Sequence, residues 1–551
     1  MEPITIALSL MVAVVVSGFL SRTSPVPLPL PLVQIALGAA IGSITDLTVK
    51  LQPEVFFLLF LPPLLFLDGW RIPKEGLLRD KGPILELALG LVVFTVLGLG
   101  FFIHWMIPAM PLAVAFALAA ILSPTDPIAV SAIAARVPIP KRMMHILEGE
   151  SLLNDASGLV CMRFAVAAAL TGSFSLPNAI VTFLWLAVGG VAIGVGVTWC
   201  VTKAKNWLTR RIGEETGSEI LISLLIPFGA YILAEHFHCS GILAAVAAGI
   251  TMSYAEISGH ALAITRVRRT AVWDAVQFSA NGIIFVLLGE QLPGLVAGAA
   301  GVVREAEHHD ESWLAIYVLA VTLALAILRF VWVWVSLRLT LHRAARTGKP
   351  SQAVSWRILA AMSVAGVRGA VTLAGVLTLP LAMPDGSAFP ARELAIFIAA
   401  GVIILSLVLA SVALPRLLRG LELPPEPSHH SRVDKARRAA AEAAIQAINR
   451  AEHAMAQGRS DADLYAETAS RIMEIYRRRI EGQSKTGEEA EANRKAYEIE
   501  RKLRLAGLRA ERNEIFRITR AGGLDDDVAR KIVREIDLLE ADLTGLSVRT
   551  A

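Results

Sequence analysis

The chain has 551 residues, of which 55% are hydrophobic and only 18% are charged. Soluble domains carry about a quarter charged residues, so this composition indicates a membrane protein. The formal net charge of +4 does not indicate nucleic-acid binding, because cytoplasmic loops of membrane proteins are themselves rich in Lys and Arg. Cys161, Cys200 and Cys239 lie in apolar stretches without CxxC spacing, so neither a disulfide framework nor a metal cluster is predicted.

A membrane-spanning helix needs about 20 mostly apolar residues. The first apolar run has no basic segment before it and no small-residue cleavage site after it, which favours a first span over a signal peptide. The eighth and ninth apolar runs are separated only by residues 236–239. The sequence predicts thirteen spans, near residues 4–20, 27–44, 53–69, 84–106, 111–133, 143–171, 179–202, 219–236, 240–253, 275–298, 313–337, 356–382 and 394–419.

Basic residues are distributed unevenly between the loops that join these spans. The loops after spans 1, 3, 5, 7, 9 and 11 hold twenty Lys and Arg, whereas the opposite loops hold three, Lys50, Arg304 and Arg392. Basic residues concentrate on the cytoplasmic side of membrane proteins. We therefore expect a multi-pass protein of the plasma (inner) membrane, with its N-terminus outside and its C-terminus in the cytoplasm.

The sequence changes character after the transmembrane domain of residues 1–420. Residues 421–431 contain three prolines and are expected to form a linker, and residues 432–551 a cytoplasmic helical domain. Both a regulatory or dimer-contact role and a plain solvated appendage are compatible with its sequence. Its expected helices cover residues 434–457, 488–520 and 525–543, with acidic residues to cap the last one.

Span five contains a helix-breaking motif beside an acidic residue. Pro124 and Pro127 flank Thr125 and Asp126, and two prolines remove two backbone donors, which predicts an unwound stretch. Non-helical backbone at membrane depth is tolerated only against protein or water, and it builds ion sites in secondary transporters. A proline kink capped by Asp126 is the alternative reading.

Span six carries several ionisable and polar residues, which cost about 2.5–3.5 kcal/mol for each charge inside a membrane. Ser151 and Asp155 are four residues apart, as are Glu150 and Asn154, so all four share one helical stripe. Carboxylate, hydroxyl and carbonyl oxygens suit a hard cation such as Na⁺. One buried carboxylate can hold a proton or a cation, and competition between them would drive exchange. A polar helix-contact stripe is the alternative.

Two arginines inside later spans are buried cations that are expected to need carboxylate partners. They are Arg329 in span eleven and Arg368 in span twelve, and Gly366 and Gly369 make span twelve a second candidate broken helix. A broken helix in each half of the chain is the pattern expected of inverted repeats. Arg163, further along span six, is either a counter-charge or a snorkelling side chain.

At these motifs the sequence resembles bacterial members of the monovalent cation/proton antiporter-1 family, the sodium/proton exchangers. The resemblance implies an all-α polytopic fold of about thirteen helices with two broken crossing helices, a dimerisation part and a core part. It also implies a homodimer that works by an elevator-like movement. The matching motifs are FLPPLLF (60–66), SPTDP (123–127), GESLLND (149–155), FVLLG (285–289) and GVRGA (366–370).

The resemblance implies a cation and proton site built around one aspartate. Asp155 matches the ion carrier, while Ser151, Asp126 and the backbone carbonyl of Thr125 match residues that help to form the site. Asp155, Ser151 and Thr125 are the expected ligands of a monovalent ion such as Na⁺. Relatives often carry Glu in span three where this chain has Asp68, which leaves open whether Asp68 reaches the ion.

The resemblance also implies structural roles and a stoichiometry. Glu150 matches a glutamate that pairs with the arginine at position 329, and this bridge steadies Asn154, a further member of the expected binding set. Arg368 matches an arginine that offsets charge at the crossed helices. Relatives with two adjacent aspartates carry two charges, so the pair Asn154-Asp155 predicts electroneutral exchange of one cation for one proton. Na⁺ is the expected cation, and a K⁺/H⁺ antiporter of the same fold is the alternative.

Three other functions are compatible with parts of the pattern. An intramembrane aspartyl protease could use Asp126 and Asp155 as a dyad, but the Gly-x-Gly-Asp signature of those enzymes is absent. A cation channel needs a continuous pore, and saturable, proton-coupled flux distinguishes an exchanger from it. A cation sensor would signal through residues 432–551. No enzymatic activity, cofactor or nucleic acid is expected, and the partners are the two ions, the lipid bilayer and a second copy of the chain.

Overall fold

The structure is a computed structural model in which every regular element is helical. It describes residues 2–23, 28–44, 53–72, 74, 81–127, 130, 141–172, 176–257, 263–305, 312–346, 355–419, 429–457, 461–484, 488–521 and 524–544. These residues contain no β-strand, only an isolated bridge between Ala382 and Ala388, which confirms the all-α prediction. They belong to two compact units, Met1–Leu421 and Glu422–Ala551.

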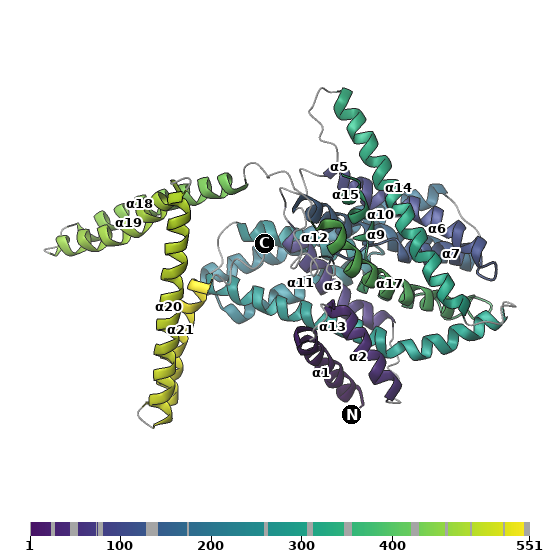
Figure 1. Cartoon of the computed structure of the whole chain (residues 1–551), viewed down its shortest axis with the longest axis horizontal. Coiled ribbons are helices and arrows are strands. Elements are labelled where there is room, and N and C mark those ends of the chain that lie inside the picture. The colour runs from purple at the N-terminus through teal and green to yellow at the C-terminus, as the bar shows by residue number, and fades with distance from the viewer. Residues whose placement is uncertain are drawn as a thin grey trace. The chain divides into compact units, whose positions relative to one another are not determined.

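The first unit is built from apolar helices, most of which are long (Figure 1). In chain order they are α1 (Glu2–Thr23), α2 (Leu30–Ile44), α3 (Pro53–Arg71), α5 (Lys81–Leu85), the π-helical stretch η1 (Glu86–Leu91), α6 (Val92–Met106), α7 (Leu112–Leu122), α9 (Lys141–Thr171), α10 (Leu176–Ile212), α11 (Thr216–His236), α12 (Gly241–Ile257), α13 (Ala263–Glu305), α14 (Ser312–Arg346), α15 (Trp356–Val364), α16 (Ala370–Leu377) and α17 (Arg392–Leu418).

Eight helices of the described residues are long and apolar enough to cross a membrane, and three shorter apolar helices, α2, α7 and α12, accompany them. Helix α3 and the pair α15–α16 occupy the two remaining predicted spans. The predicted boundary between spans eight and nine is present, because α11 ends at His236 and α12 begins at Gly241, with His238 in a left-handed conformation between them (φ 52°). The total of thirteen spans stays a prediction.

The predicted break in span five is present. Helix α7 ends at Leu122, and residues 123–126 are not helical. Pro124 and Pro127 account for this interruption, because neither residue has the backbone N–H that a helix requires. Most of residues 128–140, and with them the second half of the predicted span, lies outside the described residues.

The predicted break in span twelve is present too, and the two breaks meet. Helix α15 ends at Val364 and α16 begins at Ala370, with residues 365–369 between them. The backbone N–H of Asp126 donates to the carbonyl oxygen of Val367 over 2.7 Å. This bond joins the non-helical part of one span to that of the other, so two broken helices touch at their interruptions, as predicted.

The helices of the first unit pack in two sets, which α13 connects by packing on α17 as well. In one set α2 packs along α13 and α3 along α12, with α10 and α11 beside α12; in the other, α7 packs between α6 and α9, and α17 packs on α14, α15 and α16. Small residues permit the closest approaches; a Cβ on Gly38 of α2 would lie 2.0 Å from the Val286 carbonyl oxygen of α13.

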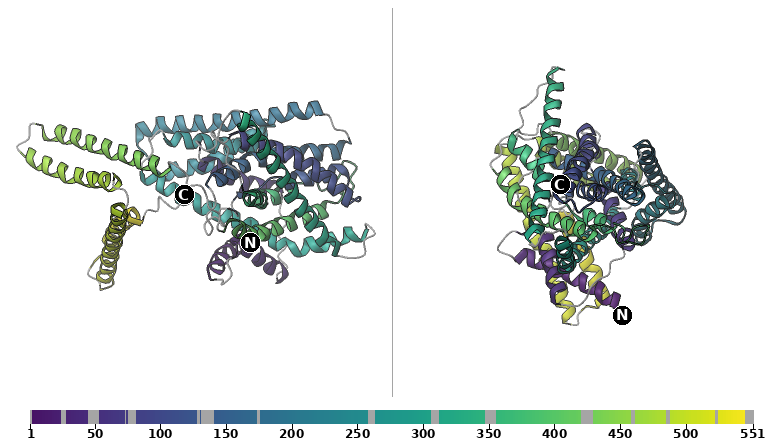
Figure 2. Two further views of the ribbon diagram at one scale, coloured as in Figure 1. Left: turned by 45° about the horizontal axis from the view of Figure 1, so that its top comes forward. Right: turned by 90° about the vertical axis from the view of Figure 1, so that its right-hand side faces the viewer.

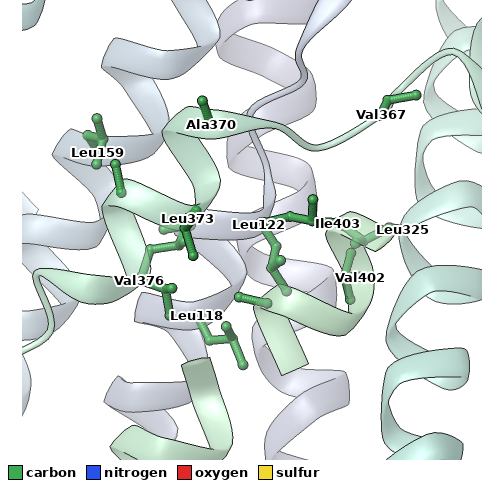
Figure 3. Packing of buried hydrophobic residues seen from close by; sticks show 14 of the residues in the cluster. Leu118, Leu122, Leu159, Leu325, Val367, Ala370, Leu373, Val376, Val402 and Ile403 are labelled. Carbon is green, nitrogen blue, oxygen red and sulfur yellow. The ribbon is translucent and has the colours of Figure 1, made fainter. Parts of the chain in front are cut away.

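Apolar side chains from several helices enclose the short helix α16. Leu373 and Val376 of α16 are both nearly inaccessible to solvent. Because these neighbours surround the break, its backbone faces protein rather than lipid, which is the condition for non-helical chain at membrane depth. The neighbours shown in Figure 3 include Leu118 and Leu122 of α7, Leu159 of α9, Leu325 of α14, and Val402 and Ile403 of α17.

The second unit contains four helices in its described residues. Helix α18 packs against α19, and α20 packs against α21, which gives two helical hairpins (Figure 2). The sequence did not predict α19, and α18 begins within the segment that was predicted as a linker, residues 421–431. The four helices are α18 (His429–Ala456), α19 (Ala462–Ser484), α20 (Glu488–Arg520) and α21 (Asp526–Thr544).

Candidate cation site

A small polar cavity lies beside the two helix breaks. Its volume is about 30 Å³, which is enough for a water molecule or a small ion. It is lined by Leu61, Leu64, Leu65 and Asp68 of α3, by Pro124, Thr125 and Asp126 at the break after α7, by Ser151 and Asp155 of α9, by Asn281 of α13, and by Gly369, Ala370, Val371 and Thr372 at the start of α16.

Asp155 and Ser151 reach this cavity from α9. They are one helical turn apart, and both are buried, with 5% and 7% of their surface exposed. Among the described residues, the Asp155 carboxylate has neither an ion pair nor a hydrogen-bond donor. A buried carboxylate without a partner is costly when ionised, so it will bind a cation or a proton. This is the arrangement that competition between two ions requires.

The neighbouring residues of α9 point into a different environment. Glu150 forms a buried ion pair with Arg329 of α14, whose Nη2 donates to Glu150 Oε2 over 2.7 Å and whose Nη1 donates to Oε1. Thr125 Oγ1 donates to Glu150 Oε1 over 3.2 Å, and Asn154 Nδ2 donates to Thr125 Oγ1 over 3.0 Å. Asn154, predicted as part of the binding set, does not line the cavity; its amide instead ties α9 to the break after α7.

Both buried arginines bond to the ends of interrupted helices. Arg329 Nε donates to the carbonyl oxygen of Met362 near the end of α15 over 3.0 Å, and Arg368 Nε donates to the carbonyl of Leu122, the last residue of α7, over 2.8 Å. Helix C-termini present unpaired carbonyls and partial negative charge, which a guanidinium offsets. The expectation of a carboxylate partner is wrong for Arg368, because within the described chain its guanidinium donates to backbone carbonyls, those of Leu122 and Gly366.

Asp126 lies where the second broken helix resumes. Its carboxylate is so close to Gly369, the residue before α16, that a Cβ there would lie 1.8 Å from Asp126 Oδ2. A carboxylate is favoured at a helix N-terminus, where backbone N–H groups and the helix dipole are positive. The alternative prediction, that Asp126 caps the second half of its own span, falls mostly on residues outside the described part of the chain.

Two residues whose roles the sequence left open have different surroundings. Asp68 of α3 lines the cavity together with Asp155. Arg163 does not line it; its Nη2 donates to Glu235 Oε1 of α11 over 3.1 Å, and both side chains are partly exposed. Asp68 therefore belongs to the candidate site by position, and Arg163 has a separate carboxylate partner.

Residues 8–420 match the family model described as sodium/hydrogen exchanger, transmembrane. The chain belongs to the sodium/hydrogen exchanger family. It is therefore a membrane antiporter of cations and protons, in agreement with the resemblance found in its motifs, and the apolar helices make it a multi-pass membrane protein.

Several relatives of this exchanger match almost its whole length. The Escherichia coli protein named uncharacterized Na(+)/H(+) exchanger YjcE is 41% identical over 98% of this chain and 99% of its own. A Bacillus pumilus protein named sodium, potassium, lithium and rubidium/H(+) antiporter is 37% identical over 98% of this chain and 78% of its own. The solved sodium proton antiporter MjNhaP1 from Methanocaldococcus jannaschii has the same fold, with a TM-score of 0.58 and 20% identity over 76% of this chain and 99% of its own.

The sequence did not single out two polar residues of the exchanger that the structure places at or next to the site. Asn281 lines the cavity from α13, and the sequence offered little to distinguish it, because the predicted span 275–298 also holds Gln277, Glu290 and Gln291. Ser157 Oγ donates to the carbonyl oxygen of Ala88 in η1 over 2.6 Å, which links the helix of Asp155 to a π-helical turn. A π-helical turn is often found at functional sites, but no residue pattern in this sequence predicted it.

Proposed function

We propose that this exchanger trades one monovalent cation, Na⁺, for one proton, and that both ions bind in turn to Asp155. The observation that carries the proposal is the unpaired, buried carboxylate of Asp155 in a cavity of ion size, beside a Glu150 that Arg329 already neutralises. Of the three carboxylates of α9, Glu148, Glu150 and Asp155, only Asp155 lines the cavity. One cation replaces one proton, and the loaded site carries the same charge in both halves of the cycle.

The proposed ion-binding set extends around the cavity. Asp155 supplies a carboxylate, Ser151 a hydroxyl and Thr125 its backbone carbonyl from the non-helical stretch. Asp126 and Asp68 add acidic groups to the lining. Oxygen ligands of this kind suit hard monovalent cations. The relatives named for sodium, potassium, lithium and rubidium support K⁺ and Li⁺ as further substrates.

Alternating access is proposed as movement between the two helix sets. Helices α9 and α16 and the break after α7 lie on one side of the cavity, and α3 and α13 lie on the other. An elevator-like displacement of the first group against the second, in a homodimer, would expose Asp155 to each face in turn. The bias of basic residues supports an N-terminus outside and a C-terminus in the cytoplasm of the inner membrane, where such exchange would serve pH homeostasis.

The test is sodium-driven proton movement in proteoliposomes, with wild type and Asp155→Asn, across pH and with or without a membrane potential. The potential is best imposed with a chloride gradient and a chloride ionophore, because K⁺ is itself a candidate substrate. A potential is worth about 2.3 kcal/mol per charge per 100 mV, so it should leave the final pH gradient of a one-for-one exchanger unchanged. The KM for Na⁺ should rise as pH falls, because protons occupy the same carboxylate.

Asp385→Asn is the matched control, since it makes the same chemical change in the exposed connection between α16 and α17. That variant should exchange at the wild-type rate, whereas Asp155→Asn should not exchange. Proton accumulation that follows the imposed potential would overturn the one-for-one stoichiometry. Sodium-driven exchange by Asp155→Asn would overturn the role of Asp155.

A further inference from the structure

Asn281 contributes a buried acceptor to the cavity that no protein group satisfies. Its side chain extends from α13 into the lining that it shares with Asp155, Ser151 and Asp68. Its amide oxygen Oδ1 is inaccessible and has no hydrogen-bond partner within the described chain. Buried acceptors in native proteins are nearly always paired, so an unpaired one that faces an ion-sized cavity indicates a group that binds what enters it.

The position of Asn281 differs from that of the other neutral ligand candidates. Ser151 and Thr125 belong to α9 and to the break after α7, which pack together, whereas α13 packs along α2. Asn281 therefore reaches the cavity from the helix set opposite Asp155. An ion bound to Asp155 would receive ligands from α9 and the broken helices on one side. On the other side of the cavity the described lining comes from α3 and α13, and Asn281 is one ligand that they can supply.

An amide oxygen is also chemically suited to this place. It is a hard, neutral ligand of the type that monovalent and other hard cations accept. Because it carries no charge, it adds a coordination bond without changing the balance of one carboxylate against one cation. A proton on Asp155 does not need such a ligand, so the amide favours the cation over the proton at the shared site.

We propose that Asn281 Oδ1 is a ligand of the transported cation and sets the affinity of the exchanger for it. This inference rests on the proposed function, because it requires that the cation bind beside Asp155. It assigns to α13 a direct part in cation binding. Loss of the ligand weakens cation binding while the carboxylate that carries the proton is untouched.

The experiment measures the KM and maximal rate for Na⁺, K⁺ and Li⁺ in proteoliposomes that contain wild type, Asn281→Leu or Asn281→Asp. Leu matches the size of Asn without an oxygen, and it should raise the KM for Na⁺ roughly three- to ten-fold, the loss expected for one polar contact, with little change in maximal rate. Asp retains an oxygen and adds charge, so at alkaline pH its KM should be below that of wild type.

Gln277→Leu is the matched control. It removes the same amide group one turn earlier on α13, where Gln277 Oε1 accepts from Arg71 over 2.8 Å and does not line the cavity, so its KM should be that of wild type. A wild-type KM for all three cations in Asn281→Leu would overturn the inference, as would an equal rise in both Leu variants. If Asn281→Leu does not fold, Asn281→Asp decides: an added charge on a cation ligand lowers the KM at alkaline pH, where the carboxylate is ionised, so a KM equal to or above that of wild type there overturns the inference.

The two proposals can fail separately. If Asp155→Asn still exchanges sodium for protons, the proposed function is wrong whatever Asn281 does. If Asp155→Asn is inactive while Asn281→Leu binds every cation as wild type does, only the role of Asn281 is wrong.

Discussion

Two faces of α9 each carry a buried carboxylate, one with an ion-pair partner in the described chain and one without. On one face, Glu150 is held by two guanidinium bonds and a hydroxyl, and Asn154 binds the same hydroxyl. On the other face, Asp155 and Ser151 line the cavity, and no charged group of the described chain forms an ion pair with Asp155. The two carboxylates are five residues apart, which places them about 140° apart around the helix axis, and of the two only Glu150 has an ion-pair partner among the described residues.

The comparison shows how one membrane helix can be both scaffold and carrier. A buried carboxylate that is paired stays ionised and holds its neighbours in place, but breaking such a pair by removing one partner costs about 3–5 kcal/mol. A buried carboxylate that is not paired contributes little to the fold, and it gains its stabilisation from the ion that it binds. The first prediction below tests this division between paired and unpaired carboxylates of α9. Two further predictions concern smaller effects, at α16 and in the second unit.

The largest effect is expected from removal of the scaffold cation. Arg329→Leu leaves Glu150 charged and unpaired inside the protein, and should lower the free energy of unfolding by about 3–5 kcal/mol. Asp155→Asn, on the other face, should unfold at nearly the wild-type temperature. Thermal unfolding of the purified proteins in detergent, followed by tryptophan fluorescence, measures both.

The double variant Glu150→Leu with Arg329→Leu sharpens this test. Replacing both members of a buried pair by apolar residues is often close to neutral, so the double variant should be more stable than Arg329→Leu alone. The division would be wrong if Asp155→Asn lost as much stability as Arg329→Leu. It would also be wrong if the double variant were the least stable of the three.

A smaller effect, on transport rather than on folding, is expected at the contact between Asp126 and α16. In Gly369→Ala the new methyl group would lie 1.8 Å from Asp126 Oδ2, so the carboxylate must move away from the cavity rim. The exchange rate should fall about ten-fold, equivalent to about 1.4 kcal/mol. The measurement is sodium-driven proton flux in proteoliposomes at equal protein content.

Gly375→Ala on the same helix is the control for that variant. Its methyl group would meet Ile121 and Leu159 at 3.4 Å, an ordinary contact distance, so transport should be retained. Equal losses in the two variants would show that any added methyl on α16 is harmful, and that the position of Asp126 is not the cause.

The smallest effect is expected in the second unit, far in sequence from the ion site. Arg512 of α20 bonds to Glu540 of α21 and pairs with Asp537 over 2.7 Å. The hydrogen bond from Arg512 lowers the pKa of Glu540. Such a shift stabilises the hairpin above the usual pKa of Glu, and this contribution is lost as the pH falls through the lowered value.

Arg512→Ala should therefore raise the pH at which α20 and α21 separate on acidification, with exchange at neutral pH unchanged. A fluorophore pair on the two helices of the full-length protein reports their separation. Arg517→Ala removes a pair with Glu514 on the same helix and should leave that pH as in wild type. An identical shift in both variants would indicate a general charge effect instead of the contact between the helices.

Much of the fold could be predicted because apolar length and proline act locally. Every predicted span coincides with one or more described helices, and Pro124 and Pro127 mark the first break correctly. The partners of Arg368 could not be predicted, because they are backbone carbonyls that any residue would supply. Asn281 could not be predicted, because the cost of a charge inside the membrane distinguishes ionisable residues and a neutral amide carries no charge. The orientation of Asn154 depends on Thr125, which lies on another element.

The hydrogen bond between Asp126 N and Val367 O has a mechanical consequence. It joins the non-helical segments of the two spans to each other. The guanidinium of Arg368 links the same two spans by donating to the carbonyl oxygen of Leu122. Pulling the two spans apart would expose peptide groups with no water to receive them. In the proposed elevator-like cycle the two spans would then move together, and the sliding boundary would lie along α3 and α13.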